Sequence, residues 1–211
     1  MPASPKPAAA APAPKPAAAV NQRWHVLASR PEPNASKIQE LREELKKESD
    51  LGLTYERWAW YLDDDDVLDR FLVARDDNVQ KASRLIRDAL AWRLKRRPHV
   101  LDYAELDREC ATGKLRVAPS LDRFGRPVVI FDNSVQNTKD AGGQLRALAF
   151  VLEHALRRCD GSQVSKYVIF LHLNDFSLRN NPSWSVTKET MKMLICCFAE
   201  CCGHIILHNA P

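Results

Sequence analysis

Four cysteines and two histidines near the end of the chain are of the types that could bind zinc: Cys196, Cys197, Cys201, Cys202, His204 and His208. Adjacent side chains on a helix point about 100° apart, so at most one member of each cysteine pair can face a common point. The chain also lacks a C-x-x-C repeat. Cys197 and Cys201 could meet at i, i+4 with His204 beyond them, but the spacing favours small buried thiols over a metal site or a disulfide framework. We therefore predict no metal.

Other residues that could do covalent chemistry lack the surroundings that catalysis needs. The chain has no G-x-S-x-G elbow and no glycine-rich phosphate loop, and Gly142-Gly143 marks only the start of a helix. His172 lies in an apolar segment, where a core or edge histidine is more common than a catalytic base without a nucleophile. The sequence thus predicts neither an enzyme nor a cofactor.

Two clusters of charge have more than one interpretation. Lys95-Arg96-Arg97 suits a helix C-terminus before Pro98, and contact with anionic lipid headgroups is the alternative. The run Asp63–Asp66 suits a helix N-terminus more than a metal site, because consecutive side chains diverge around a helix. Net charge is +4, and Lys6 and Lys15 in the first twenty residues supply two of those charges, so residues 21–211 carry only +2. We predict no nucleic-acid partner.

A helical region carries both of these charge clusters. Residues 1–33 are rich in Ala, Pro and Lys and predict a disordered tail. Apolar spacings of three and four predict helices over 34–49, 54–62, 63–72 and 78–97, packed as a small module. A Ser36-x-x-Gln39 capping box opens the first helix, while Thr54 and Asn78 cap the second and fourth.

An α/β region follows. We expect a short helix near 105–111, followed by strands over 115–117 and 127–131 that are joined by a turn at 122–125. A helix over 144–158 and a strand over 166–174, buried on both faces, come next. A helix over 183–202 then starts after the Asn180-Asn181-Pro182 turn, and a strand over 204–208 follows it. The last strand has the length and β-branched content of an interior strand rather than of a terminal tail, so we expect that a segment that should cover it is missing. This alternation predicts an α/β fold with a mixed or parallel sheet and covering helices.

Five ordered motifs in residues 34–211 resemble the CRAL-TRIO lipid-binding family, which includes phosphatidylinositol transfer proteins and carriers of retinaldehyde and tocopherol. They comprise the helical signature Leu68–Arg75 with Asn78–Ala82 and Ala91–Arg93, then Asp122–Val128, Leu173–Leu178, Asn181–Ser185, and Ala199–Gly203 running into Asn209–Pro211. The resemblance implies a CRAL-TRIO helical module over 34–97 and a CRAL-TRIO mixed sheet over 98–211. The family continues beyond Asn-Ala-Pro with a gate helix and further strands, so we expect a C-terminally incomplete domain with an open, weakly binding pocket that exposes residues 167–171 and 205–207.

The family resemblance also implies site residues. A hydrophobic ligand would lie against a sheet floor lined by Tyr167, Ile169, Leu171, Ile205 and Leu207. In phosphatidylinositol-binding members, the positions of Arg75 and Glu200 belong to the polar network around the inositol phosphate. Pairing of Arg75 with an acid of the 63–69 segment, and a helix–helix contact for Glu200, are the alternatives.

Departures from the family pattern affect the choice of lipid. Asp76 stands where those members have Lys, and Ala199 and Cys201 replace a Pro and an Arg around the motif Glu. Tyr167 and Ile169 replace the Ser and Thr that help hold choline headgroups. The resemblance therefore favours a phosphoinositide-type phospholipid over a choline lipid.

The predicted function is binding and transfer of this lipid between membranes. We expect a bound lipid if the domain is complete, and transient contact with a membrane surface. We also expect a cytoplasmic or peripheral-membrane location, because the sequence has no secretory or transit signal and its longest apolar run, 193–199, is too short to span a bilayer. One alternative is a protein-interaction or regulatory module that binds a protein partner through the tail or the helices. Another is a dimer linked by zinc through the cysteine cluster.

Overall fold

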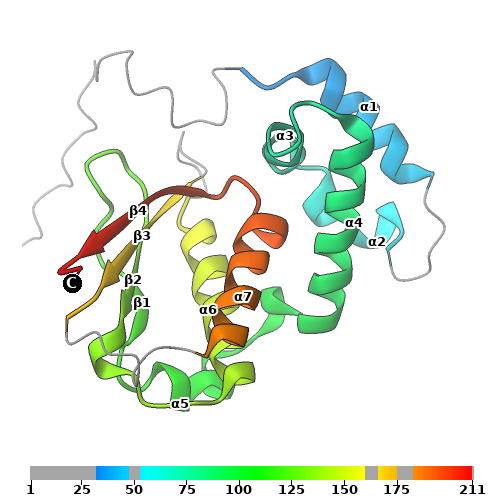
Figure 1. The fold of residues 1–211 in the computed structure, drawn as a ribbon. Coiled ribbons are helices and arrows are strands. Elements are labelled where there is room, and N and C mark those ends of the chain that lie inside the picture. Colours follow the sequence, from blue (N-terminus) through cyan, green and yellow to red (C-terminus); the bar gives the residue numbers. More distant parts are fainter. Residues whose placement is uncertain (1–31, 48–52, 160–165, 175–182, 211) are drawn as a thin grey trace, which may run out of the picture.

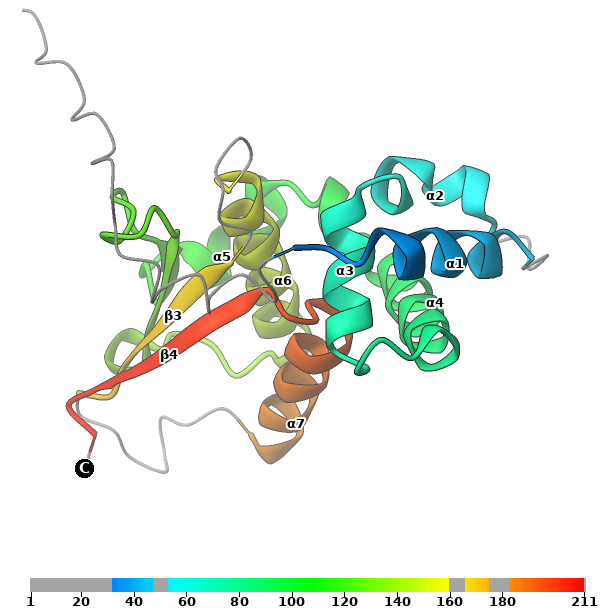
Figure 2. The same cartoon turned by 90° about the horizontal axis from the view of Figure 1, so that it is seen from above.

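A computed structural model describes residues 32–47, 53–159, 166–174 and 183–210. Two of the predicted features, the tail (apart from its last two residues) and the Asn180-Asn181-Pro182 turn, lie outside these residues, as does part of the Leu173–Leu178 motif. In Figures 1 and 2 a four-stranded sheet, a pair of helices packed on it, and a group of four helices follow one another across the molecule.

The group of four helices confirms the predicted helical segments. It consists of α1 (Ala35–Lys46), α2 (Tyr55–Leu62), α3 (Asp65–Val73) and α4 (Val79–Arg96). The predicted capping box at Ser36 is wrong, because the helix begins earlier: the Asn34 side chain accepts a hydrogen bond from the Lys37 amide at 3.1 Å. Asn78 caps α4 as expected, accepting from the Lys81 amide at 2.9 Å.

Apolar faces of these helices share one core. α1 contributes its buried residues Ile38, Leu41 and Leu45 at spacings of three and four, and Leu68, Phe71 and Leu72 come from α3. Ala199, which is far away in the sequence, belongs to the same core. The helical part and the α/β part are therefore packed against each other at this residue.

The sheet has the order β1-β2-β3-β4, with strands Leu115–Val117, Val128–Asp132, Tyr167–His172 and Cys202–His208. β1 and β2 are antiparallel, as the predicted hairpin requires, and β2, β3 and β4 are parallel. Helices α6 (Ala141–Arg157) and α7 (Trp184–Lys192) make the two crossovers. The mixed sheet with covering helices is the predicted fold class.

Short helical segments join the two parts: 3-10 turns at Pro98–Val100 and Tyr103–Leu106, and the helix α5 (Asp107–Cys110). A further 3-10 turn, Asn133–Val135, lies between β2 and α6. α6 begins three residues before the predicted start, because Asp140 caps it by accepting from the Gly142 amide. α7 ends at Lys192 and continues as a π-helical turn, Met193–Cys197, instead of running as one helix to 202.

The expected exposure of residues 205–207 in the last strand is confirmed. β4 is the edge strand of the sheet in the described part of the chain, and the side chains from His204 to His208 are all exposed. The expected exposure of residues 167–171 is wrong in part, because Tyr167, Val168 and Ile169 are buried under neighbouring elements. Apolar composition identifies a strand but does not say whether something covers it.

Candidate functional site

One face of the sheet is apolar and is only partly covered. Residues paired across parallel strands point to the same face, and the register pairs Val129 with Ile169 and Ile169 with Ile205. Val129 and Ile169 belong to the core formed with α6, whereas Ile205 is 54% exposed. Two residues on, Leu207 on the same face of β4 is 59% exposed. The apolar floor thus continues beyond the helices that cover it.

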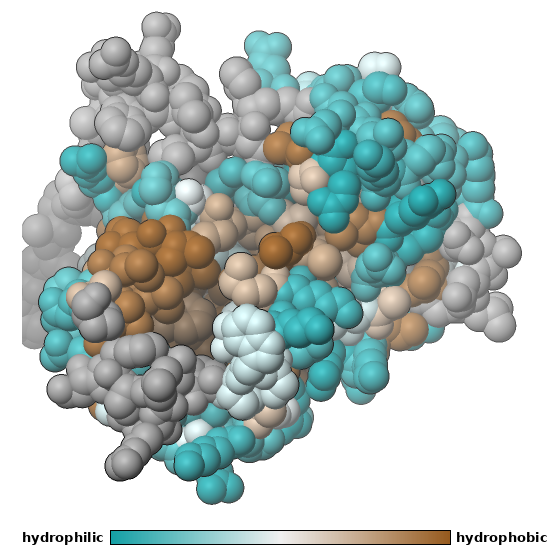
Figure 3. Space-filling model, viewed as in Figure 1, coloured by the Kyte–Doolittle hydropathy of each residue, from teal (hydrophilic) through white to brown (hydrophobic). Residues whose placement is uncertain are grey.

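A groove adjoins this floor. About 490 Å³ of empty space, partly open to solvent, is lined by the apolar residues Leu115, Phe131, Ala147, Leu148 and Val186. Figure 3 shows hydrophobic side chains gathered over β3 and β4 beside a recess in the surface. Phe131 pairs with Leu171, and Leu171 with Leu207, so the groove and the exposed part of the floor share one face of the sheet. Together they can hold a hydrophobic ligand.

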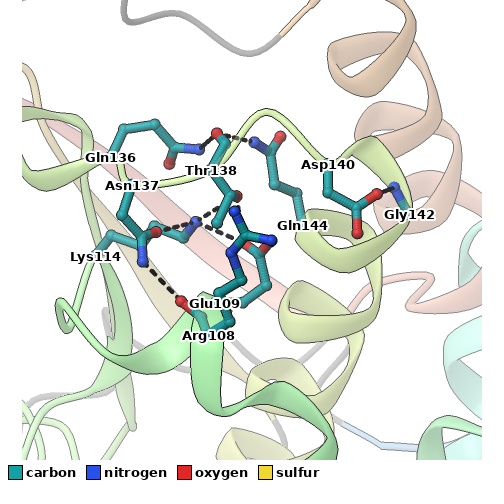
Figure 4. Close-up of polar contacts among 9 residues, drawn as sticks. All are labelled: Arg108, Glu109, Lys114, Gln136, Asn137, Thr138, Asp140, Gly142 and Gln144. Atoms are coloured by element: carbon teal, nitrogen blue, oxygen red, sulfur yellow. Dashed lines mark hydrogen bonds and ion pairs between the residues drawn. The ribbon is translucent and has the colours of Figure 1, made fainter.

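The groove has a polar end, built around a buried lysine (Figure 4). The Nζ of Lys114 donates to Glu109 Oε2 at 2.5 Å, Asn137 Oδ1 at 2.8 Å and Thr138 Oγ1 at 3.1 Å. Thr138 Oγ1 in turn donates to Glu109 Oε2 at 2.8 Å. Lys114 and Glu109 are both nearly inaccessible, so all three ammonium protons have acceptors inside the protein.

Two amide side chains hold the loop that carries this network. Gln136 Nε2 and Gln144 Nε2 both donate to the Thr138 carbonyl, at 2.6 Å and 2.9 Å. Both glutamines also line the groove. Sequence analysis missed this polar end, because its members come from four separate elements and form no local motif.

Gly143 is required at this place by close packing. A Cβ at position 143 would lie 2.7 Å from Glu109 Oε1 and 2.8 Å from Asp140 Oδ2, and Glu109 cannot move away without breaking its bond to Lys114. We expect Gly143→Ala to lower the free energy of unfolding by about 1–3 kcal/mol, as overpacking does. Urea denaturation measures this change in the free energy of unfolding.

Gly142→Ala is the matched control. A Cβ there meets only Asp140 Oδ1, at 3.4 Å, so this neighbouring substitution should leave stability within about 0.5 kcal/mol of the parent. Equal losses for the two variants would show that the packing around Glu109 does not set the requirement.

The predicted floor residues fall into two groups. Tyr167 and Ile169 are 0% and 2% exposed and lie in the core beneath α6, and Leu171 is half-buried at its border. Ile205 and Leu207 are open to a ligand. The Tyr167 hydroxyl has no hydrogen-bond partner among the residues that the structure describes, and burial raises the pKa of Tyr167 well above its usual value, so this phenol stays neutral.

The predicted headgroup residues lie where the two parts of the molecule meet. Arg75 follows Ala74 and Glu200 follows Ala199, and both alanines pack in the helical core. Arg75 Nη1 donates to the Ala74 carbonyl at 2.6 Å. Glu200, in a left-handed conformation with φ of 57°, pairs with Lys166 Nζ at 3.3 Å. Lys166 precedes a strand, so this ion pair is not the helix–helix contact that was the alternative for Glu200.

Cysteines and histidines near the chain end point in different directions. Cys197 and Cys201 are buried, and burial raises the pKa of both thiols, that of Cys197 to about 12. Arg126 Nη1 donates to His204 Nδ1 at 2.8 Å, while the Nδ1 atoms of His172 and His208 lie 2.9 Å apart at the strand ends. In the described residues, no three His, Cys, Asp or Glu side chains are placed to hold a metal ion.

Comparison with known proteins finds similarity to a family model and to a curated relative. Residues 112–211 match the family model for the CRAL/TRIO domain. A CRAL-TRIO domain-containing protein of Schizosaccharomyces pombe is 32% identical over 142 residues, which is 67% of this chain. The match spans only 14% of the length of that relative. Among the described helices, none has the length and apolar character needed to cross a bilayer.

Proposed function

Since the chain belongs to the CRAL-TRIO family, we propose that it binds a hydrophobic lipid in the groove between β1, β2, α6 and α7 and on the adjoining floor of β4, and transfers it between membranes. The observation that carries this proposal is the apolar floor at Ile205 and Leu207, which is continuous with the groove and open to solvent. Members of this family are typically lipid-binding transfer proteins rather than enzymes. Such transfer needs no catalytic residue.

Energetics of acyl-chain exchange fit an open groove. Removing each methylene from water is worth about 0.8 kcal/mol, but a bilayer gives the chain nearly the same gain. Exchange between the bilayer and the groove is then close to balanced, and contacts with the headgroup decide which lipid is preferred.

For the headgroup we propose an inositol phospholipid, bound where Arg75 and Glu200 lie. A guanidinium suits a phosphate because it can donate two parallel hydrogen bonds, and a carboxylate can accept from inositol hydroxyls. Lys166, which already pairs with Glu200, adds a second cation at the same junction. Competition between phosphatidylinositol and phosphatidylcholine in a transfer assay tests this choice, and equal transfer of both lipids would remove it.

Leu207→Asp should reduce lipid transfer between vesicles at least tenfold. A carboxylate on the floor would have to be desolvated by the acyl chain, and the apolar contact of Leu207, worth about 1.5–3 kcal/mol when fully buried, would be lost. Transfer of a fluorescent lipid and native mass spectrometry of the purified protein measure the effect. Because Leu207 is exposed without lipid, the substitution should leave the fold intact.

Ile206→Asp is the control for this experiment. Ile206 is the next residue of the same strand, is similarly exposed at 47%, and points to the opposite face. Lipid transfer at the wild-type rate by Ile206→Asp, together with loss of transfer by Leu207→Asp, would support lipid binding on the groove-facing side of β4. Protein that is empty by mass spectrometry and transfers no lipid would contradict the proposed function.

A further inference from the structure

A second hollow lies in the helical part, between α2 and the C-terminal end of α4. It is open to solvent, holds about 710 Å³ of empty space, and is lined by Arg57, Trp58, Trp60, Arg93, Leu94, Arg97 and His99. None of these residues lines the groove beside the sheet. In both ribbon views α2 is well separated from β4 (Figures 1 and 2).

This hollow has a surplus of positive charge. Three arginines line it, and no acidic side chain does. Arg93 is 2% exposed, its Nη2 pairs with Glu153 at 2.6 Å, and its guanidinium lies over the Tyr61 ring at 4.5 Å, but its Nε and Nη1 have no hydrogen-bond acceptor among the described residues. Buried donors without acceptors are rare in folded proteins. Their presence in the wall of an arginine-lined hollow indicates that an anion is the missing partner.

The acidic group that acts on His99 is Glu153, and it already pairs with Arg93, so the arginines at the hollow remain in excess. Burial, and then the Arg93 guanidinium, lower the pKa of His99, so its imidazole is neutral at pH 7. The Nδ1 of His99 is buried without a hydrogen-bond partner in the described part of the chain. Arg157 Nη2 donates to the His99 carbonyl at 3.0 Å, which brings a fourth guanidinium close to the hollow.

The rim of the hollow is apolar and aromatic. Trp60 is 58% exposed, yet its ring contacts Trp58 at 5.9 Å and His99 at 5.1 Å between centroids, so it is supported on its inner side. Leu94, also on the rim, is exposed. A tryptophan and a leucine beside arginines are the side chains that favour the boundary between headgroups and acyl chains. A binding site for a soluble phosphate compound would not require them to be exposed.

We propose that this hollow docks the protein on membranes by taking the phosphate of an anionic phospholipid headgroup. Arg57 and Arg97 contact the phosphate from the two sides of the hollow, with Arg93 behind it. Trp60 and Leu94 lie in the interfacial layer, and the adjacent Lys95 and Arg96 add to the attraction for the charged surface. This docking does not depend on whether the groove beside the sheet holds a lipid.

Sedimentation of the full chain with phosphatidylcholine vesicles, with and without phosphatidylserine, tests the proposal at physiological ionic strength. We expect binding only with phosphatidylserine, and a roughly 30-fold weaker binding for Arg57→Gln/Arg97→Gln, which corresponds to about 1 kcal/mol per arginine. Lys81→Gln/Arg84→Gln removes the same charge from an exposed part of α4 and should weaken binding only slightly.

Three results would overturn the proposal. Unchanged vesicle binding by Arg57→Gln/Arg97→Gln would exclude the hollow as the docking site. An equal loss of vesicle binding in the control Lys81→Gln/Arg84→Gln would show that the effect depends only on net charge. Complete displacement from vesicles by excess inorganic phosphate at constant ionic strength would mean that the hollow binds soluble phosphate instead. Failure of lipid transfer with intact vesicle binding would contradict only the groove, so the two proposals can be separated.

Discussion

Replacing Lys114 with methionine should lower the free energy of unfolding by about 3–5 kcal/mol, because it leaves the carboxylate of Glu109 buried without its counter-ion. Asn137 and Thr138 lose the same donor, so the polar end of the groove is left with several unpaired acceptors. Urea denaturation followed by circular dichroism measures the change.

Two further variants identify the cause. Lys37→Met removes a lysine from an exposed i, i+3 pair with Glu40 and should cost less than about 0.5 kcal/mol. Glu109→Leu/Lys114→Met removes both buried charges and should recover most of the loss. If the double variant is no more stable than Lys114→Met alone, an uncompensated carboxylate is not the source of the instability.

The second large effect concerns the contact between α4 and α6. Glu153→Leu should lower the free energy of unfolding by about 3–5 kcal/mol, since Arg93 would remain buried with no anion beside it. Burial alone lowers the pKa of Arg93, whereas Tyr61 and Glu153 raise it, and the net pKa is raised. Although the variant lacks the contribution of Glu153, the guanidinium still keeps its proton, because arginine is not deprotonated in proteins.

A double-mutant cycle with Arg93→Met measures the coupling in this pair. Most of the lost stability should return in Arg93→Met/Glu153→Leu, although Arg93 also packs over the Tyr61 ring at 4.5 Å and that contact is not restored. Additive losses in the two single variants would show that the ion pair does not couple α4 to α6.

Local patterns predicted most of the elements, because each has its own signal. Asn78 and the apolar positions of α4 mark a helix whatever surrounds it, and the run from Tyr167 to Leu171 marks a strand. The same local signals gave wrong details where the outcome depends on contacts with neighbouring residues, such as the choice of a helix cap. Asn34 and Ser36 are both good caps, and only the folded helix shows that Asn34 is used.

The candidate site was less predictable than the fold. Ile205 and Leu207 could be named as floor residues from the family resemblance, but their exposure depends on what lies beside β4. The network around Lys114 joins residues up to 29 apart in the sequence, so no window of sequence contains it. For the same reason, the meeting of α2 with the end of α4 around Arg93 could not be foreseen from the Lys95-Arg96-Arg97 cluster.

β4 offers its outer row of backbone N–H and C=O groups without a strand beside it in the described part of the chain. Its Ile205–Leu207 stretch contains neither a proline nor a charged residue that would oppose pairing. Every molecule presents the same edge, so two copies can join their sheets around a two-fold axis by hydrogen bonding β4 to β4. The exposed area of β4 should therefore fall as protein concentration rises.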